Sequence, residues 1–157
     1  VLNVFRMFGM MSGQRVEAES NRMYALSDVL KSSIRGEQSD IGALATKDKG
    51  HAAVMIWNYH DDDRPGPIET VQVAIQQIGV KKATLRIYMI DEQHSNSYEV
   101  WKKMGSPQQP TASQIAELEN SGQHSCIETK KVRINEGKLT LPNQLQRQAV
   151  ALVKLDW

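Results

Sequence analysis

Short segments in which apolar and polar residues alternate recur along most of this chain, and they constrain its fold more than any other feature. A period of two places successive side chains on opposite faces of a β-strand. Segments rich in Pro, Gly, Asn and Asp, such as 61–67 and 135–138, separate the alternating segments with turns. Short strands separated by such turns predict a mainly β chain that folds as an antiparallel β-sandwich. The predicted strands lie at 15–19, 53–59, 71–75, 85–90, 132–134, 139–141 and 149–155, of which 53–59 is apolar on both faces, as in a central strand.

The N-terminal segment has helical periodicity instead. Its apolar residues lie three or four positions apart, so they form one stripe along a helix that ends before Gly13. A helix this apolar needs a partner. We expect residues 1–12 to pack against a second copy of the chain, against the sandwich, or against a catalytic piece in the same assembly. The stripe consists of Val1, Val4, Phe5, Phe8 and Met11.

Two insertions interrupt the series of strands. Thr111 followed by Gln114 has the pattern of a capping box, and Gly122 stands where a helix would end, which predicts one short inserted helix over about 111–121. Residues 25–50 are polar and weakly patterned, so we expect a long surface connection there that includes a helical turn.

Length, charge and cysteine content exclude several classes of protein. The 157 residues are too few for a complete (β/α)₈ barrel, which takes at least about 200. Nineteen Lys and Arg against eighteen Asp and Glu leave no basic surplus for a nucleic-acid partner. The longest apolar segment, 52–57, falls short of the roughly 20 residues of a membrane span. Cys126 stands alone and cannot form an internal disulfide, which favours the cytoplasm over the periplasm without deciding between them.

The densest polar cluster lies at 91–98, directly after a predicted strand. Asp91, His94 and Asn96 offer the donors and acceptors that sugar hydroxyls need, and Trp101 could stack on a sugar ring. Alternatively, the same residue types form loops in which Asp, Ser and Asn cap backbone groups. The sequence leaves both interpretations open.

No other group has the spacing of a catalytic or metal site, and no cofactor is expected. The four histidines are scattered, and 61–63 is interpreted as a solvated turn because no calcium-ligand pattern follows it. Cys126 would need activation by His124, but no orienting third group is evident, so a buried or inert thiol is expected. Trp57 lies in the most apolar strand and is expected in the core.

Together with the residues on either side of it, the polar cluster resembles the C-terminal region of bacterial β-xylosidases of glycoside hydrolase family 39. The most specific match is residues 90–111, with the sequence IDEQHSNSYEVWKKMGSPQQPT. Residues 1–8 resemble the last helix of the (β/α)₈ barrel of those enzymes. Residues 53–60 are similar to a core strand of their β-sandwich domain, and 150–157 to its closing strand.

The resemblance implies a division of the chain and a role for it. Residues 1–13 would be the remnant of the last barrel helix, and 14–157 the β-sandwich accessory domain. Enzymes of the family release terminal β-1,4-linked xylose with retention of configuration, using two barrel glutamates. No residue of this chain corresponds to either glutamate. The resemblance therefore implies no catalytic residue here, and a segment that is inactive alone.

The partners implied by the resemblance are the catalytic barrel of the same enzyme and, in the intact enzyme, a xylo-oligosaccharide. Asp91, His94, Asn96 and Trp101 would then edge the substrate cleft. Two alternatives stay open. One is an autonomous carbohydrate-binding module, and the other is an oligomerisation or stability domain that associates through residues 1–12.

Overall fold

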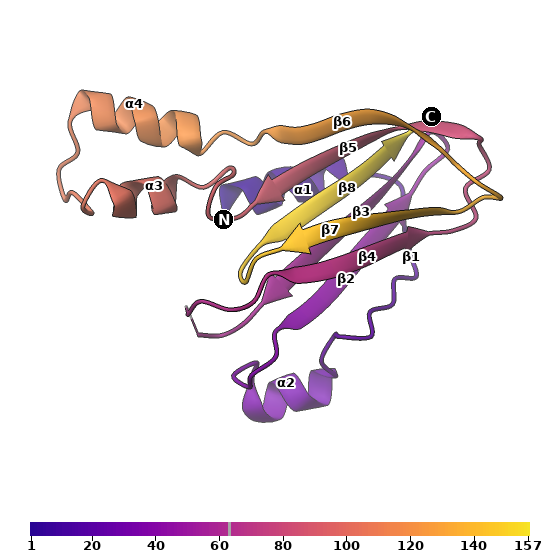
Figure 1. Ribbon diagram of the computed structural model, residues 1–157, viewed down its shortest axis with the longest axis horizontal. Helices are drawn as coiled ribbons and strands as arrows, with labels where there is room; N and C mark the ends of the chain where they lie inside the picture. Colours follow the sequence, from indigo (N-terminus) through magenta and orange to yellow (C-terminus); the bar gives the residue numbers. More distant parts are fainter. Residues whose placement is uncertain (63) are drawn as a thin grey trace.

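The computed structural model describes residues 1–62 and 64–157, and its strands form two antiparallel sheets (Figure 1). The predicted mainly β, antiparallel sandwich is confirmed. Asp63, part of the predicted turn, lies outside the described residues. The strands of the described part are β1 (Gln14–Val16), β2 (Asp40–Lys47), β3 (His51–Tyr59), β4 (Glu69–Ile75), β5 (Lys82–Ile90), β6 (Cys126–Arg133), β7 (Leu139–Leu145) and β8 (Val150–Asp156). The helices are α1 (Leu2–Met10), α2 (Leu26–Ser32), α3 (Ser97–Lys103) and α4 (Ala112–Ser121).

The two sheets differ in width. The larger has the order β1-β2-β3-β8-β5-β6, and the smaller consists of β4 and β7 only. All of these pairings are antiparallel. The C-terminal strand β8 therefore lies in the middle of the larger sheet, between β3 and β5.

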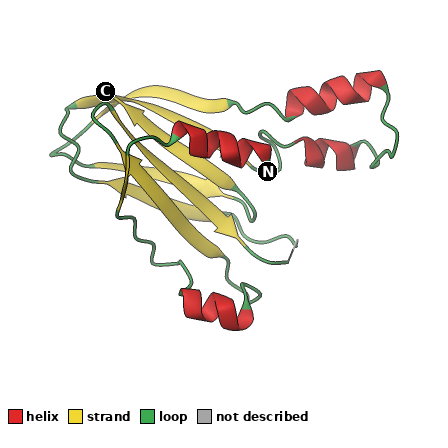
Figure 2. Ribbon diagram, turned by 180° about the vertical axis from the view of Figure 1, so that it is seen from behind, coloured by secondary structure: helices red, strands yellow, loops and turns green. Residues whose placement is uncertain are grey.

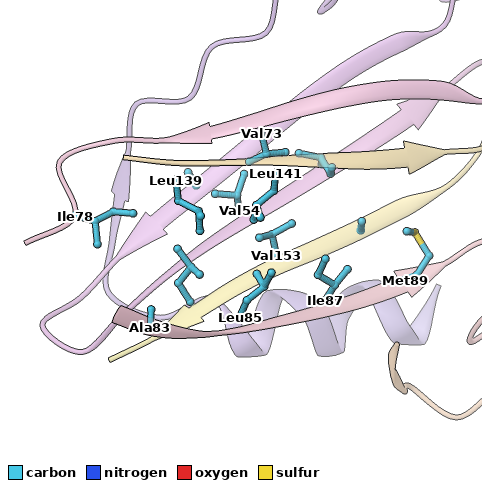
Figure 3. Close-up of a cluster of buried hydrophobic side chains, with 14 of the residues drawn as sticks. Val54, Val73, Ile78, Ala83, Leu85, Ile87, Met89, Leu139, Leu141 and Val153 are labelled. Carbon is cyan, nitrogen blue, oxygen red and sulfur yellow. The ribbon is translucent and has the colours of Figure 1, made fainter. Parts of the chain in front are cut away.

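The main core lies between the sheets (Figure 3). Alternation in β5 and β7 directs one set of side chains inward, and Leu85, Leu145 and Val153 are completely buried there. Each fully buried side chain of this size contributes about 1.5–3 kcal/mol relative to exposure. β8 is buried on both faces, because Leu152 belongs to a second cluster on the outer face of the larger sheet.

Helix α1 covers that outer face (Figure 2). Met7 is completely buried against Ala53, Met55 and Leu152, so this face of the helix packs on the chain's own sandwich. Of the predicted apolar stripe, Met11 packs against this cluster, whereas Phe5 remains 64% exposed. The methionine face docks because flexible thioether chains fill the irregular surface of a sheet better than rigid rings do.

The segment 25–50 was predicted only in part, because the expected helical turn is present but a strand was missed. It contains both α2 and β2, and β2 pairs with β3 along its whole length. The strand escaped detection because Gly42, Ala43 and Ala45 are small and weakly β-forming, and because burial along it does not alternate. Trp57 of β3 is also only half-buried, and its indole N–H donates to Asp40 Oδ2 at 2.9 Å.

The inserted helix is present as α4, and it has a partner helix. Thr111 and Gln114 form the predicted capping box. The second helix, α3, was not expected, because the polar residues at its start were interpreted as part of a loop. The two helices pair as a hairpin that projects beyond the end of the sheet (Figure 1). Within the described residues, no helix is both long and apolar enough to span a membrane.

Candidate functional site

The predicted polar cluster forms a tight turn between β5 and α3, with Asp91 at its centre. The Asp91 carboxylate accepts backbone N–H bonds from Gln93 and His94, each at 2.7 Å. It also contacts Nδ1 of the His94 ring at 2.9 Å. Asp91 is thus occupied by its own turn, and its side chain is only 11% exposed.

Asn96 has a structural role in the same turn. Its Nδ2 donates to the Asp91 carbonyl oxygen at 2.9 Å, and its Oδ1 accepts the backbone N–H of Tyr98 at 3.1 Å, which caps α3. Between these residues Ser95 is buried and has a φ of 55°, in the left-handed region. For Asp91 and Asn96 the structure therefore shows the capping arrangement that was the alternative to sugar binding.

His94 keeps a surface that a ligand could reach. Its side chain is 39% exposed, and the contacts to Asp91 engage Nδ1. A carboxylate accepts only the protonated nitrogen, so the neutral ring carries its proton on Nδ1 and presents Nε2 as an acceptor. His94 could therefore accept a hydroxyl hydrogen, as from a sugar, with its tautomer fixed by Asp91.

Trp101 lies on α3, one turn after Tyr98, rather than in the loop. Its indole N–H donates to the Pro107 carbonyl oxygen at 3.0 Å. Its ring stacks on Tyr98 with centroids 5.7 Å apart, and Lys102 Nζ lies 5.0 Å from the Tyr98 centroid. Trp101 thus contributes mainly to the internal order of the helical hairpin.

Asn3 was not among the predicted residues, yet it ties this region to the sandwich. It is buried on α1, and its Nδ2 donates to the carbonyl oxygens of Ser95 at 2.7 Å and Gly122 at 2.9 Å. One side chain therefore holds the polar turn and the end of α4 against α1. The available signal was a single amide within a mostly apolar helical segment.

The pair His124 and Cys126 is not arranged as a nucleophile with its base. The His124 ring stacks on Tyr88, with centroids 5.0 Å apart, and burial, together with the charge of Arg6, lowers its pKa. Of the two expectations for Cys126, a buried or an inert thiol, burial is wrong, because Cys126 is exposed. Its Sγ contacts Thr129 Oγ1 at 3.2 Å. Across 1–62 and 64–157, no three His, Cys, Asp or Glu side chains gather where they could hold a metal ion.

Comparison with known proteins identifies a matching family and a curated relative. The family model "Glycosyl hydrolases family 39" matches residues 1–140. A β-xylosidase of Geobacillus stearothermophilus is 25% identical over 107 residues, which cover 68% of this chain and 21% of that protein.

Solved structures agree on the fold. A GH39 enzyme from Xanthomonas axonopodis pv. citri superposes with a TM-score of 0.73 at 12% identity, covering 97% of this chain and 29% of that one. A monomeric β-xylosidase from Caulobacter crescentus CB15 gives 0.70 at 14% identity, again covering 97% and 29%. The chain thus spans less than a third of the length of these relatives. Because the family model covers most of its residues, the chain belongs to glycosyl hydrolases family 39.

Proposed function

We propose that this chain is the non-catalytic C-terminal β-sandwich portion of a retaining β-xylosidase. The observation that carries the proposal is that it belongs to family 39 while spanning only 21–29% of the relatives named above. In the intact enzyme, two barrel glutamates would hydrolyse terminal β-1,4-xylose from xylo-oligosaccharides. The sandwich would support that barrel.

Helix α1 is the proposed junction between the two parts, with residues 1–13 as the last barrel helix and 14–157 as the accessory domain. One face of α1 packs on the sandwich through Met7. Another face is apolar and bare, with Leu2 and Phe5 each 64% exposed and Phe8 46% exposed. A bare face of this kind marks a surface that is covered in the assembled protein. Barrel strands and a neighbouring helix would cover it.

The turn at Asp91 is proposed to edge the substrate cleft, with His94 as its contact to sugar. His94 is half-exposed and has a tautomer fixed by Asp91, whereas the polar groups of Asn96 are used within the turn. One hydroxyl bonded to Nε2 would contribute about 1 kcal/mol to binding. The turn would in this way restrict binding beyond the terminal xylose.

Replacing His94 with alanine in the full-length enzyme is expected to raise KM for xylobiose about threefold to tenfold, as the loss of roughly 1 kcal/mol requires. The kcat value should change less, because the turn carries no reacting group. Steady-state kinetics with xylobiose measures both.

His51→Ala is the matched control, because His51 bonds Ser12 at the start of a different strand, β3. Asn96→Ala would be ambiguous, since losing a helix cap costs about 1 kcal/mol of stability. If His94→Ala and His51→Ala give the same KM at unchanged thermal stability, His94 has no role at the cleft.

A role in oligomerisation or stability is a second candidate, and the bare face of α1 favours it. In the chain alone, the same phenylalanines could contact a second copy. No observation favours an autonomous carbohydrate-binding module, which needs an aromatic platform open to sugar. Tyr98 and Trp101 stack on one another instead, and Lys102 lies over the Tyr98 ring.

A further inference from the structure

The base of the helical hairpin meets the N-terminal end of α1 at a buried side chain, Asn3 (Figure 2). Both hydrogens of its amide are used, because Nδ2 donates to the carbonyl oxygens of Ser95 and Gly122. Its Oδ1 accepts from Nη1 of Arg6 at 3.0 Å, which orients the amide with its nitrogen toward the two carbonyls. Only 8% of Asn3 is exposed, so the bonds are largely shielded from water. A single amide thus joins α1 to two other segments.

The two carbonyls belong to the segments that begin and end the hairpin. Ser95 lies in the polar turn before α3, and Gly122 directly follows α4. These segments lie close together, since a Cβ at Gly122 would stand 3.4 Å from the Cβ of Ser97 at the start of α3. Asn3 therefore binds the hairpin at the point where its two helices converge.

The turn that contains Ser95 is braced internally, so its parts move together. The backbone N–H of Asp91 donates to the carbonyl oxygen of His94 at 3.2 Å, and the Asp91 carboxylate accepts the N–H of His94 in return. Ser95 adds a further bond, because its Oγ accepts the backbone N–H of Ser125 at 3.4 Å. The group that holds the Ser95 carbonyl therefore also holds the imidazole of the neighbouring His94.

We propose that Asn3 is a positioning residue, which sets the place of the turn that carries His94 relative to the barrel. This inference rests on the proposed function, in which residues 1–13 are the last barrel helix and His94 contacts sugar. Asn3 then belongs to the catalytic part, while the carbonyls that it binds belong to the accessory domain. It touches no substrate itself. It acts by keeping His94 within reach of a sugar hydroxyl, because a displacement of about 1 Å is enough to lose a hydrogen bond.

Asparagine suits this role because its amide nitrogen presents two donors at one point. Aspartate has nearly the same shape, but an ionised carboxylate has acceptors only. At position 3 one of its oxygens would face the carbonyl oxygens of Ser95 and Gly122 with no hydrogen between them. Asn3→Asp therefore breaks both bonds without emptying space in the interior.

The kinetics of Asn3→Asp in the full-length enzyme test the proposal. KM for xylobiose should rise about threefold to tenfold, as for His94→Ala, while kcat changes less. A variant that merely unfolds part of the enzyme lowers the apparent kcat and leaves KM unchanged. Asn120→Asp is the matched control, because it makes the same chemical change at an exposed position of α4. It should leave KM as it is.

The double variant, Asn3→Asp with His94→Ala, shows whether Asn3 acts through His94. If it does, the double variant has the KM of His94→Ala alone, since residues that act as a unit are not additive. A further rise in KM as large as that caused by Asn3→Asp alone would overturn the proposal. If only His94→Ala raises KM, the proposed function stands and this inference fails. If neither does, the role of the turn at the cleft fails as well.

Hydrogen exchange covers the case in which Asn3→Asp lowers stability. In the 157-residue chain, the variant should exchange the amides of 93–98 at least about tenfold faster than the parent, while β3 and β8 keep their protection. Unchanged exchange in 93–98 would overturn the proposal. Equal acceleration in the turn and in the core strands would also overturn it, because Asn3 would then support the fold as a whole.

Discussion

Replacing Met7 with alanine is expected to lower the free energy of unfolding by about 2–4 kcal/mol, the cost typical of removing a buried methionine side chain. Met7 is completely buried beneath α1, against Ala53, Met55 and Leu152. Its loss would leave a cavity between the helix and the sheet. Urea denaturation of the chain, followed by circular dichroism, measures the change.

Phe5→Ala is the matched control on the same helix. Phe5 is 64% exposed, so its removal should change stability by no more than about 0.5 kcal/mol. The contrast separates the docked face of α1 from its bare face. If Phe5→Ala is as costly as Met7→Ala, the helix docks through the apolar stripe and not through its methionine face.

Replacing Gly13 with alanine is expected to be about as costly, at roughly 2–4 kcal/mol. Gly13 has a φ of +87°, which strains any residue that carries a Cβ. A Cβ at this position would also overlap the backbone carbonyl of Lys47, which cannot move without disturbing β2. The glycine therefore fixes how the chain leaves α1 and enters β1. Thermal or urea denaturation measures the loss.

Gly9→Ala serves as its control, because a Cβ at Gly9 would meet nothing within 4 Å. Alanine in a helix interior is favoured over glycine by about 0.5–1 kcal/mol, so this variant should be slightly more stable. Equal effects at the two glycines would show that the connection between α1 and β1 tolerates other conformations.

The sequence predicted helices and strands where a clear signal comes from residues that are neighbours in the chain. Alternation located β5 and β7, and the Thr111–Gln114 capping box located α4, because these signals depend on neighbouring residues alone. β2 was missed since its small residues carry a weak pattern. Its place in the sheet depends on pairing with β3, which is a long-range contact.

The candidate site shows the same limit. The turn at Asp91 was recognised as polar and dense, but residue types could not show that Asp91 and Asn96 bond within the turn while His94 remains half-exposed. Asn3 lies 92 residues from Ser95 in the sequence, so its bond to that carbonyl could not be anticipated. Likewise, the helical spacing gave a stripe that contains both Met11, which packs on the sheet, and Phe5, which stays exposed, because the side of α1 that docks is set by the sheet beneath it.

The measurement that most directly tests the non-catalytic assignment is the release of 4-nitrophenol from 4-nitrophenyl β-D-xyloside by the purified 157-residue chain. We predict a rate no different from that of buffer, because the proposed function places both catalytic glutamates of the enzyme outside this chain. Saturable turnover that disappears when a single glutamate of this chain is replaced would contradict the assignment. The chain would then contain an active site of its own.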